Sequence, residues 1–510
     1  MSLVLLGESE NVYIYPWYLA DLVATRDVKK ITGRTVSRLF AHIEQGRFRY
    51  YYDLESAHKI GRWLMRRITE DRRYYKKIIS GIGRQEKSLL EFIGSVDRIE
   101  NDSKSTDEKL AGILNDYSRR LRAMRAWGWL PVFLDGFEIN FLSDHLRVIF
   151  QSFLRLRGCP EKFAEYYSLF STSDKMSEVG KEHLARLKML RAMLKSGLDK
   201  RRIIGVLGGR RFSGIDVRKA NRLIAKHLHD FGWLTYYYSG PAMSRQQLKQ
   251  NVVADFKAGD IDGQIREVYN KERGRSQKKK KLENKLGLNS DLKYFFTVSA
   301  RLMQIKDQRK GVYQKSYLAM DKIMLEAAKR IGLSLKEAKY LTIDEITRVL
   351  KGAEKSKLFR AKAKSRAKKC CYEVKNGIIS IKEGKKCSIA AGKAEKEAKA
   401  ARQKTAILTG LIAYPGIAKG KVRIVNKSKD MVGFKRGNIL VSRSTNPDLI
   451  LAMRKAAAIV TDSGGIVSHA AIVSRELKIP CIVGARRATE FFRDGDRALV
   501  DAEKGRIFKI

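Results

Sequence analysis

The stretch Thr461–Gly484, TDSGGIVSHAAIVSRELKIPCIVG, decides how the C-terminal part of this chain folds. It follows AAAIV (456–460), a short apolar run typical of a buried strand. The first five residues form a glycine-rich turn, VSHAAIVSREL has the apolar spacing of a helix, and PCIVG returns to a strand. The pattern predicts a strand–turn–helix–strand unit, with His469 at or near the start of the helix.

The predicted position of His469 suits phosphate chemistry. Backbone N–H groups at a helix start have no partner within the helix, and the helix dipole adds partial positive charge there. Glycines such as Gly464 and Gly465 let the backbone approach a phosphate closely. A neutral imidazole at this point can attack a phosphoryl group, and the same surroundings stabilise the product. By itself, however, the turn also fits a histidine that is only a core or capping residue.

Three further side chains are candidates for supporting the histidine. Ser468 and Thr461 could supply a hydroxyl that holds the imidazole ring or the phosphate oxygens. Arg475 lies six residues after His469, less than two helical turns along, and could supply charge or face solvent. The sequence indicates no metal ligands among these residues.

The whole stretch resembles the phosphohistidine signature of the phosphoenolpyruvate-utilising enzymes, T-x-x-G-G-x-x-S/C-H-A-A-I-x-x-R-E-x-x-I-P-x-x-V-G. The matching residues are Thr461, Gly464, Gly465, Ser468, His469, Ala470, Ala471, Ile472, Arg475, Glu476, Ile479, Pro480 and Gly484. The resemblance continues in YPGIAKGKVRIV (414–425), in NILVSRSTNPDLILAMRKAAAIV (438–460) with Pro447 and Asp448, and in FFRDGDRALVDAEKGRIFKI (491–510). It implies a compact swivelling β/β/α domain over residues 405–510, in which His469 carries phosphate between separate active sites.

Residues 1–350 have the pattern of a large all-α body, so the chain is expected to be an α+β multidomain protein. SAHKIGRWLMRRITEDRRYYKKIISGI (56–82) and EKLAGILNDYSRRLRAMRAW (108–127) place apolar residues three and four positions apart. Ser334 and Thr342 each precede an acidic residue by three or fewer positions, which predicts two helix starts.

The helical body is similar to the middle region of rifampicin phosphotransferase-like and pyruvate, water dikinase-like proteins. The similarity lies in GRFRYYYDLESAHKIGRWL (46–64), in the spacing of His227, Phe231 and Trp233, and in ARLMQIKDQRKGVYQKSYL (300–318). It implies a site for the phosphoryl acceptor, with His227, Trp233, Arg301 and Arg309 as its candidate residues. The alternatives are a packed aromatic cluster for His227 and Trp233, and a plain helix surface for the two arginines.

Residues 351–404 form a basic region with a predicted hairpin. KSKLFRAKAKSRAKK (355–369) and AAGKAEKEAKAARQK (390–404) are rich in alanine and basic residues. Between them, two alternating runs flank Asn376-Gly377, a pair typical of a tight hairpin turn. We expect the second basic stretch to be either a linker to a moving domain or a helix docked on the body.

The net charge of +49 on 510 residues is extreme. It reflects either a lysine- and arginine-rich proteome or attraction to polyanions. The run Lys278–Lys281 fits a solvated loop, but it also supports an alternative function: a basic regulatory or nucleic-acid-binding protein that retains the carrier fold. GVLGGRRFSG (205–214) fits a turn better than a phosphate loop, because it lacks the final Lys-Ser/Thr of such loops.

The cysteines and the apolar runs indicate a cytoplasmic protein with no membrane contact. The five cysteines include no CxxC pair, which is typical of reduced thiols in a cytosol. MSLVLLGESENVYIY has no basic region before its short apolar run, so we expect no signal peptide, and no apolar stretch reaches the length of about 18 residues that spans a bilayer.

The resemblance also bears on partners. Fully active members of the family have an ATP-grasp nucleotide domain, and those that form phosphoenolpyruvate add a C-terminal barrel; neither pattern occurs here. We therefore expect a phosphotransferase component without a cofactor of its own. A separate ATP-grasp protein would supply ATP and Mg²⁺ and load His469, which would pass the phosphoryl group to a small-molecule acceptor.

Overall fold

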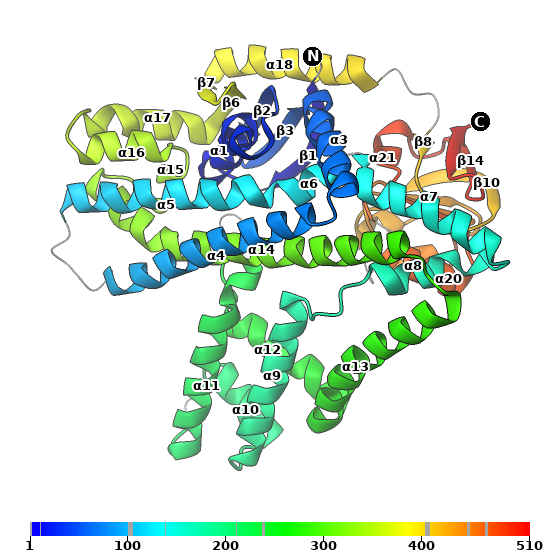
Figure 1. Ribbon diagram of the computed structural model, residues 1–510. Coiled ribbons are helices and arrows are strands. Elements are labelled where there is room, and N and C mark those ends of the chain that lie inside the picture. Colours follow the sequence, from blue (N-terminus) through cyan, green and yellow to red (C-terminus); the bar gives the residue numbers. More distant parts are fainter. Residues whose placement is uncertain are drawn as a thin grey trace. The chain divides into compact units, whose positions relative to one another are not determined.

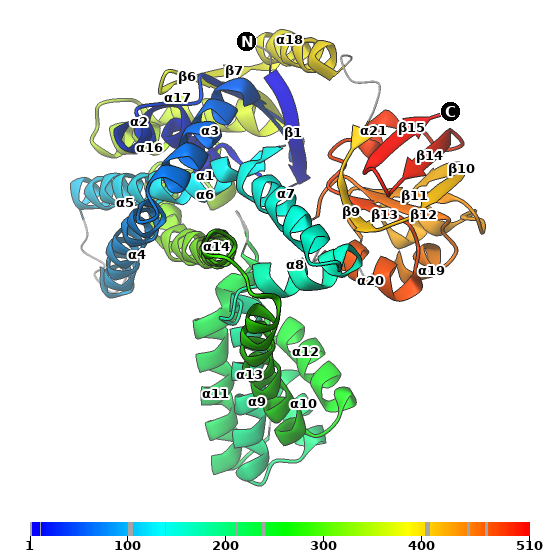
Figure 2. The same cartoon turned by 45° about the vertical axis from the view of Figure 1, so that its right-hand side comes forward.

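The chain divides into two compact units, which are described separately. The computed structural model describes residues 3–10, 12–99, 106–137, 139–210, 212–236, 240–402, 408–445, 449–464 and 468–510. Residues 1–146 and 172–401 form the helical unit, and residues 147–171 and 402–510 form the C-terminal unit. Helices predominate from the blue to the green part of the chain and strands in the orange and red part (Figures 1 and 2), so the α+β class is confirmed.

A five-stranded antiparallel sheet lies within the helical unit. Its strands, in the order β1-β3-β2-β6-β7, are β1 (Leu3–Glu10), β3 (Arg47–Asp53), β2 (Arg38–Glu44), β6 (Lys369–Lys375) and β7 (Ile378–Glu383). The predicted hairpin is confirmed, since β6 pairs with β7 across Asn376 and Gly377, which have φ values of 52° and 76°. Both residues therefore adopt the left-handed conformation of a two-residue hairpin turn.

This sheet corrects two expectations. The body is not all-α, because β1, β2 and β3 come from its first 53 residues. Residues 351–404 are not a separate linker either, because β6 pairs with β2 along its whole length, from Arg38 opposite Lys375 to Glu44 opposite Lys369. Pairing between segments so far apart in sequence leaves no local periodic signal, so the sequence could not predict it.

The second basic stretch forms α18 (Gly384–Arg402), which is docked on the sheet. Its buried residues Cys387, Ala394 and Ala398 pack with Leu3 and Phe40 in one apolar cluster. Burial of these small side chains fixes the helix on the body, as a docked helix requires. Of the two expectations for this stretch, the docked surface helix is correct for residues 384–401.

The other helices of the main body include three long ones, α4, α5 and α14, which pack against one another (Figure 1). The body helices are α1 (Ile14–Leu22), α2 (Lys29–Thr32), α3 (Leu54–Glu70), α4 (Tyr74–Ile99), α5 (Asp107–Gly128), α6 (Leu130–Leu134), α14 (Ser290–Arg330), α15 (Leu335–Ala338), α16 (Ile343–Leu350) and α17 (Ser356–Lys368). Ser334 and Thr342 form capping boxes with Glu337 and Glu345, so both predicted helix starts are confirmed.

Five helices of the helical unit form a lobe with an apolar core of its own. They are α9 (Glu178–Lys195), α10 (Lys200–Leu207), α11 (Ile215–Phe231), α12 (Arg245–Ala258) and α13 (Ile261–Leu286). Lys278–Lys281 lie within α13, so the expected solvated loop is wrong, and Lys279 pairs with Asp174 at 2.9 Å. GVLGGRRFSG spans the end of α10 and its connection to α11.

The C-terminal unit is built on an eight-stranded sheet in the order β8-β15-β14-β10-β11-β12-β13-β9. The strands are β8 (Leu408–Thr409), β9 (Leu411–Tyr414), β10 (Ile417–Ile424), β11 (Ile439–Ser442), β12 (Ala458–Thr461), β13 (Cys481–Val483), β14 (Arg497–Asp501) and β15 (Arg506–Lys509). Its helices are α19 (Ile450–Met453), α20 (His469–Leu477) and α21 (Ala488–Phe491), together with α8 (Phe163–Ser171) and the second half of α7 (Phe141–Leu156).

The parallel strands β10 to β13 bury side chains on both faces. Leu440 and Ile459 face a core that includes Ala470 and Ala471 of α20, while Val441 and Val460 face a second core that includes Val500 and Ile507. Alternation along each strand produces this division. Figure 2 shows α19 and α20 along one side of these strands. The predicted mixture of strands and helices in this unit is therefore confirmed, with α20 packed on one face of the sheet.

The described residues carry neither a disulfide nor a candidate membrane span. All five cysteines are free thiols, and four of them are buried. No described helix combines the length and the apolar composition that crossing a bilayer requires.

Candidate functional site

His469 is the first residue of α20 and lies beside the carboxyl ends of two parallel strands. β11 and β12 end together, with Ser442 opposite Thr461. The chain after β11 leads to Thr445, and the chain after β12 leads through the glycine turn to α20. The carboxyl edge of a parallel sheet is where open α/β folds bind their ligands. The fold therefore places the predicted helix start at a suitable edge.

Thr445 holds the imidazole ring. Its Oγ1 lies 3.0 Å from Nδ1 of His469, and both side chains are half-buried. Where Nδ1–H donates to the hydroxyl, the proton stays on Nδ1 and the lone pair of the ring is on Nε2. The contact thus orients the ring and, in this tautomer, leaves Nε2 as the nucleophilic atom.

Ser468 acts as a helix cap. Its Oγ accepts a hydrogen bond from the backbone N–H of Ala471 at 3.4 Å, which satisfies one of the free donors at the start of α20. The sequence offered this hydroxyl as a holder of the ring or the phosphate, but the described contact is with the helix backbone. Its place beside the N-terminus of α20 still puts it close to any group bound there.

The glycine turn needs Gly464 for two reasons. Its φ of +116° is a conformation that side chains other than glycine rarely adopt. A Cβ built on Gly464 would also lie 3.0 Å from Cβ and Oγ of Ser468. Glycine at position 464 therefore avoids a crowded contact with Ser468, the residue that directly precedes α20.

Thr461 lies beneath this turn with an unused hydroxyl. It is fully buried, and its Oγ1 has no hydrogen-bond partner among the residues that the structure describes. Oγ1 would lie 3.9 Å from a Cβ on Gly464. A buried hydroxyl without a partner loses free energy unless it gains a hydrogen bond, so Thr461 is available to a group bound at the turn.

Asp462 fixes the next part of the site. Its carboxylate accepts hydrogen bonds from the backbone N–H and the hydroxyl of Thr489 at the start of α21. Burial raises the pKa of Asp462, while the bonds from Thr489 oppose that shift. Nearby, Ser463 donates its hydroxyl to the carbonyl of Arg443 at 2.7 Å, which joins the segments that follow β11 and β12. These contacts make the edge beside His469 a connected framework.

Some predicted residues lie outside the described parts. Gly465, Pro447 and Asp448 fall in the segments 465–467 and 446–448, and the side chain of Arg475 is also not among those described. The roles expected of them stay predictions. Within the described ranges, no group of three or more histidine, cysteine, aspartate or glutamate side chains could hold a metal ion.

Thr445 is the contact that the sequence analysis missed. It lies in SRSTNPD, directly after β11, at the same edge of the sheet as the turn that follows β12. The sequence did contain a signal for this contact. Thr445 follows β11, the strand next to β12, and the carboxyl ends of parallel strands meet at one edge of a sheet.

In the helical unit, His227 and Trp233 are packed residues. His227 is buried, and its Nε2 lies 3.0 Å from the carboxylate of Glu182, which also pairs with Arg186 at 2.6 Å. The indole N–H of Trp233 donates to the carbonyl of Asp230 at 2.7 Å. Lys315 lies 4.6 Å from the centre of the indole ring. These surroundings match the packed alternative rather than an open acceptor site.

Arg301 and Arg309, the other two candidate acceptor residues, do not line the largest of the described cavities in the helical unit. Arg301 is exposed, donates to Gln304 at 3.1 Å and lines a small cavity of about 200 Å³. Arg309 lies over the ring of Tyr313, 5.8 Å from its centre. The four residues that the resemblance grouped as an acceptor site therefore have different neighbours in the fold.

A larger cavity of about 510 Å³ lies between α9, α13 and α14 and contains none of these four residues. It is lined by Thr172, Ser173, Lys175, Met176, Ser177, Gly180, His183, Val268, Lys271, Glu272, Arg275, Met303, Gln304 and Asp307. Nε2 of His183 lies 3.4 Å from the buried carboxylate of Asp255, so a carboxylate orients an imidazole at this cavity. Its lining comes from three distant segments, which explains why local patterns did not predict it.

The comparisons with known proteins concern the C-terminal part of the chain. Residues 434–505 match the family described as PEP-utilising enzyme, mobile domain. The chain is 44% identical over 132 residues to a probable phosphoenolpyruvate synthase of Archaeoglobus fulgidus, covering 26% of this chain and 17% of the relative. It is 36% identical over 188 residues to the phosphoenolpyruvate synthase of Pyrococcus furiosus, covering 37% and 23%.

A further relative is the uncharacterized phosphotransferase YvkC of Bacillus subtilis, 45% identical over 98 residues, or 19% of this chain and 12% of the relative. The chain spans less than a quarter of the length of each of these three proteins. Over residues 434–505 the chain therefore matches the mobile domain of PEP-utilising enzymes, and its C-terminal part is similar to phosphoenolpyruvate synthases and to a phosphotransferase.

Proposed function

We propose that this protein is a phosphotransferase component that carries a phosphoryl group on Nε2 of His469. The observation that carries the proposal is the 3.0 Å contact between Thr445 and Nδ1 of His469 at the first residue of α20. It supports a ring with its free lone pair on Nε2, beside the N-terminus of a helix, which attracts phosphate. The match of residues 434–505 to the mobile domain supports the same role.

The transfer proceeds in two steps. The Nε2 lone pair attacks the phosphorus atom of the donor, the P–O bond to the leaving group breaks, and that oxygen keeps the electron pair. A nucleophilic atom of the acceptor then attacks the phosphorus atom of the phosphohistidine and forms a bond to it, while the N–P bond breaks and its electron pair returns to Nε2 of the imidazole. In both steps the protein's contribution is positioning and stabilisation of negative charge.

The donor in this proposal is ATP with Mg²⁺, bound by a separate ATP-grasp protein. The relatives named phosphoenolpyruvate synthase extend well beyond the part that this chain matches. The acceptor is a small molecule, and the cavity of about 510 Å³ in the helical unit is our candidate for its site. His183, held by Asp255, could take a proton from the acceptor there, and Lys271 and Arg275 supply positive charge.

A labelling experiment tests the carrier role. The full chain is incubated with ³²P-labelled phosphoenolpyruvate, and separately with ³²P-labelled ATP, Mg²⁺ and a candidate ATP-grasp protein. We expect a label that is stable in base and lost in acid, as a phosphoramidate is, on the wild-type chain and not on His469→Ala. The matched control is His229→Ala, because His229 is an exposed histidine on α11 of the other unit.

The control should label like the wild type. Absence of label with every donor on a folded wild-type chain, or equal labelling of His469→Ala, would overturn the proposal. Acceptor transfer is then followed as loss of label from the purified phosphorylated chain, with His183→Ala expected to slow the loss but not the loading.

A further inference from the structure

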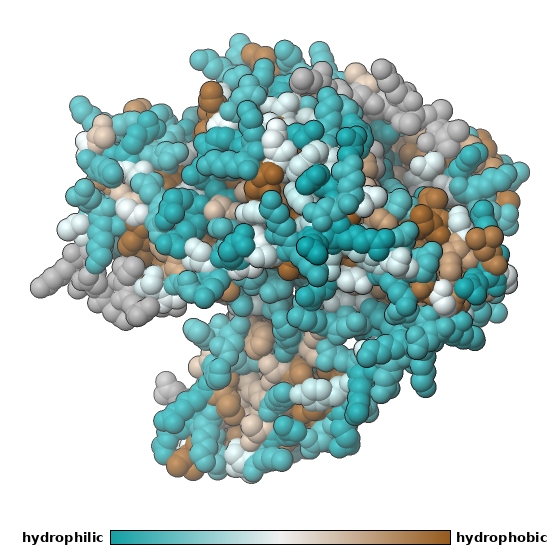
Figure 3. Space-filling view, in the orientation of Figure 1, coloured by the Kyte–Doolittle hydropathy of each residue, from teal (hydrophilic) through white to brown (hydrophobic). Residues whose placement is uncertain are grey.

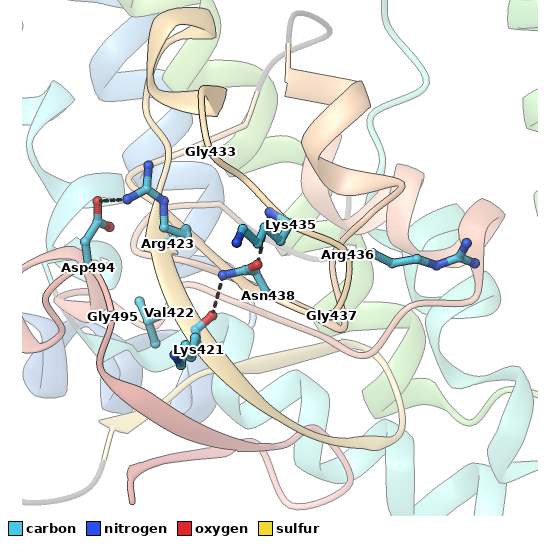
Figure 4. Close-up of a pocket in the computed structure, with 10 residues that line it drawn as sticks. All are labelled: Lys421, Val422, Arg423, Gly433, Lys435, Arg436, Gly437, Asn438, Asp494 and Gly495. Atoms are coloured by element: carbon cyan, nitrogen blue, oxygen red, sulfur yellow. Dashed lines mark hydrogen bonds and ion pairs between the residues drawn. The ribbon is translucent and has the colours of Figure 1, made fainter.

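The C-terminal unit has a second hollow, which the phosphoryl transfer does not use. It has a volume of about 480 Å³ and lies where β10, the loop before β11 and the loop before β14 meet (Figure 4). It is lined by Lys421, Val422, Arg423, Gly433, Lys435, Arg436, Gly437, Asn438, Asp494 and Gly495. This volume falls within the range of about 300–1,000 Å³ that small-molecule sites occupy.

The hollow and His469 lie at opposite ends of the parallel strands. The lining residue Asn438 directly precedes β11, and Val422 pairs with Ile439, the first residue of that strand. His469 and Thr445 lie beyond the other end of β11 and β12. Four residues of β11 separate the two edges by roughly 13 Å, so a small molecule in the hollow does not contact the imidazole.

Positive charge dominates the hollow. Four cationic side chains line it against a single acidic one, Asp494, which already pairs with Arg423 at 2.9 Å. Figure 4 shows this pair and shows Arg436 extending away from the other labelled side chains. Lys421 and Lys435 are exposed, and in the described part of the chain neither ammonium group has an ion-pair partner. Within the described residues, two cations without an ion-pair partner, Lys421 and Lys435, therefore remain at the hollow, and Arg436 adds a third positive charge to its lining.

Two contacts hold the Arg423 side chain, and one of its N–H groups is left without a partner among the described residues. Besides its pair with Asp494, it donates to the carbonyl of Val432 at 2.9 Å. Its buried Nε has no partner among the residues described. Asn438 fixes the loop opposite, since it accepts from the N–H of Lys435 at 3.1 Å and donates to the carbonyl of Lys421 at 3.2 Å. Because these hydrogen bonds already order Arg423 and the backbone of Lys421 and Lys435, less conformational entropy is lost when an anion binds.

We propose that this hollow binds a small phosphate-bearing anion with at least two negative charges, at a site separate from His469. Ammonium and guanidinium groups are the usual phosphate ligands, and their charge here exceeds that of Asp494. A nucleic acid strand is a poorer fit, because no aromatic side chain lines the hollow on which a base could stack.

Inorganic pyrophosphate is the probe that tests this site. Calorimetric titration of the full chain at moderate salt is expected to show saturable binding. Lys421→Ala and Lys435→Ala should each weaken it roughly tenfold, since each removes a charge-assisted hydrogen bond. The matched control is Lys504→Ala, which removes one exposed lysine from the turn between β14 and β15, outside the hollow. It and His469→Ala should bind as the wild type does.

Several outcomes would overturn the proposal. These are no saturable binding, equal weakening by Lys504→Ala, and loss of binding in His469→Ala, which would place pyrophosphate at the carrier site instead. A short oligonucleotide that binds in a Lys421-dependent way while pyrophosphate does not would assign the hollow to nucleic acid. Because labelling of His469 is measured separately, failure of this site leaves the carrier role intact, and the reverse also holds.

Discussion

At the residue scale, the hydroxyl of Thr445 is the contact that fixes the orientation of the His469 imidazole. It binds Nδ1 at 3.0 Å, from a segment that follows a different strand. Without a partner, an imidazole rotates and exchanges its two tautomers, so only part of the population has its lone pair on Nε2. The role of Thr445 is therefore positioning, and its loss should lower the rate of phosphorylation without removing the nucleophile.

Thr445→Val is expected to slow the phosphorylation of His469 by roughly two- to tenfold, the effect of one lost hydrogen bond. Valine keeps the shape of the side chain, so circular dichroism should show an unchanged fold. Thr445→Ser keeps the hydroxyl and should retain most of the rate. A serine variant as slow as the valine variant would mean that the hydroxyl does not act through the ring.

Asp21 is a second residue whose surroundings make a measurable prediction. Its fully buried carboxylate accepts hydrogen bonds from the hydroxyls of Tyr52 and Tyr372, at 3.0 and 2.8 Å. Burial raises its pKa to about 6, although the two tyrosines and the charge of Arg125 act against that shift. The folded state therefore holds a proton on Asp21 more tightly than the unfolded chain does.

A folded-state pKa above the unfolded value contributes stability at low pH that is lost as the pH rises through about 6. Asp21→Asn removes this titration. The free energy of unfolding of the wild type relative to Asp21→Asn should fall by roughly 2–3 kcal/mol between pH 4 and pH 7. Urea unfolding at a series of pH values measures it, and a difference that stays constant with pH would contradict the prediction.

At the scale of elements, Arg366 joins three of them. From α17 it pairs with Glu345 of α16 at 2.7 Å and with Glu383 of β7 at 3.0 Å, and its side chain is only 5% exposed. Burial would raise the pKa of Glu345, but the guanidinium of Arg366 holds that pKa below its ordinary value. This pairing is part of what makes residues 356–383 a component of the body.

Arg366→Ala should lower the free energy of unfolding of the helical unit by about 3–5 kcal/mol, because it leaves a buried carboxylate unpaired. The matched control is Arg348→Ala, which removes the pair with Glu354, where the arginine side chain is 54% exposed. That change should cost no more than about 1 kcal/mol. If chemical denaturation finds the two variants equal, α17 and β7 are attached more loosely than the contacts indicate.

At the scale of the whole molecule, the charge of +49 has consequences that do not depend on any single site. The face drawn in Figure 3 is largely hydrophilic, in keeping with 31% charged residues. Fields of this strength attract polyanions over a distance that salt shortens to about 10 Å at 0.1 M. Non-specific attraction therefore has to be separated from site-specific binding in any assay of this protein.

We expect the chain to bind heparin and mixed-sequence nucleic acid at low ionic strength, with affinity that falls by orders of magnitude between 50 and 200 mM salt. His469→Ala should leave this binding unchanged, because the effect comes from the total charge. Fluorescence anisotropy over a salt series measures it. A specific nucleic-acid function would instead appear as sequence-dependent binding that persists at high salt.

The sequence alone determined the parts of this protein that depend on neighbours along the chain. Local spacing predicts the alternation of strands and helices in residues 408–510. Local capping and turn residues likewise predict the capping boxes at Ser334 and Thr342 and the hairpin at Asn376-Gly377. His469 at the start of α20 belongs to the same group. Each could be predicted because its cause lies within a few residues.

Only the tertiary structure decided the contacts between distant segments. It paired β2 with β6, brought Thr445 to the ring of His469, and buried His227 against Glu182, although the family resemblance implied an acceptor site there. Strand partners, hydroxyl contacts and buried ion pairs depend on which surfaces meet after the chain has folded back on itself. Periodicity gives the face that an element buries, but not what it is buried against.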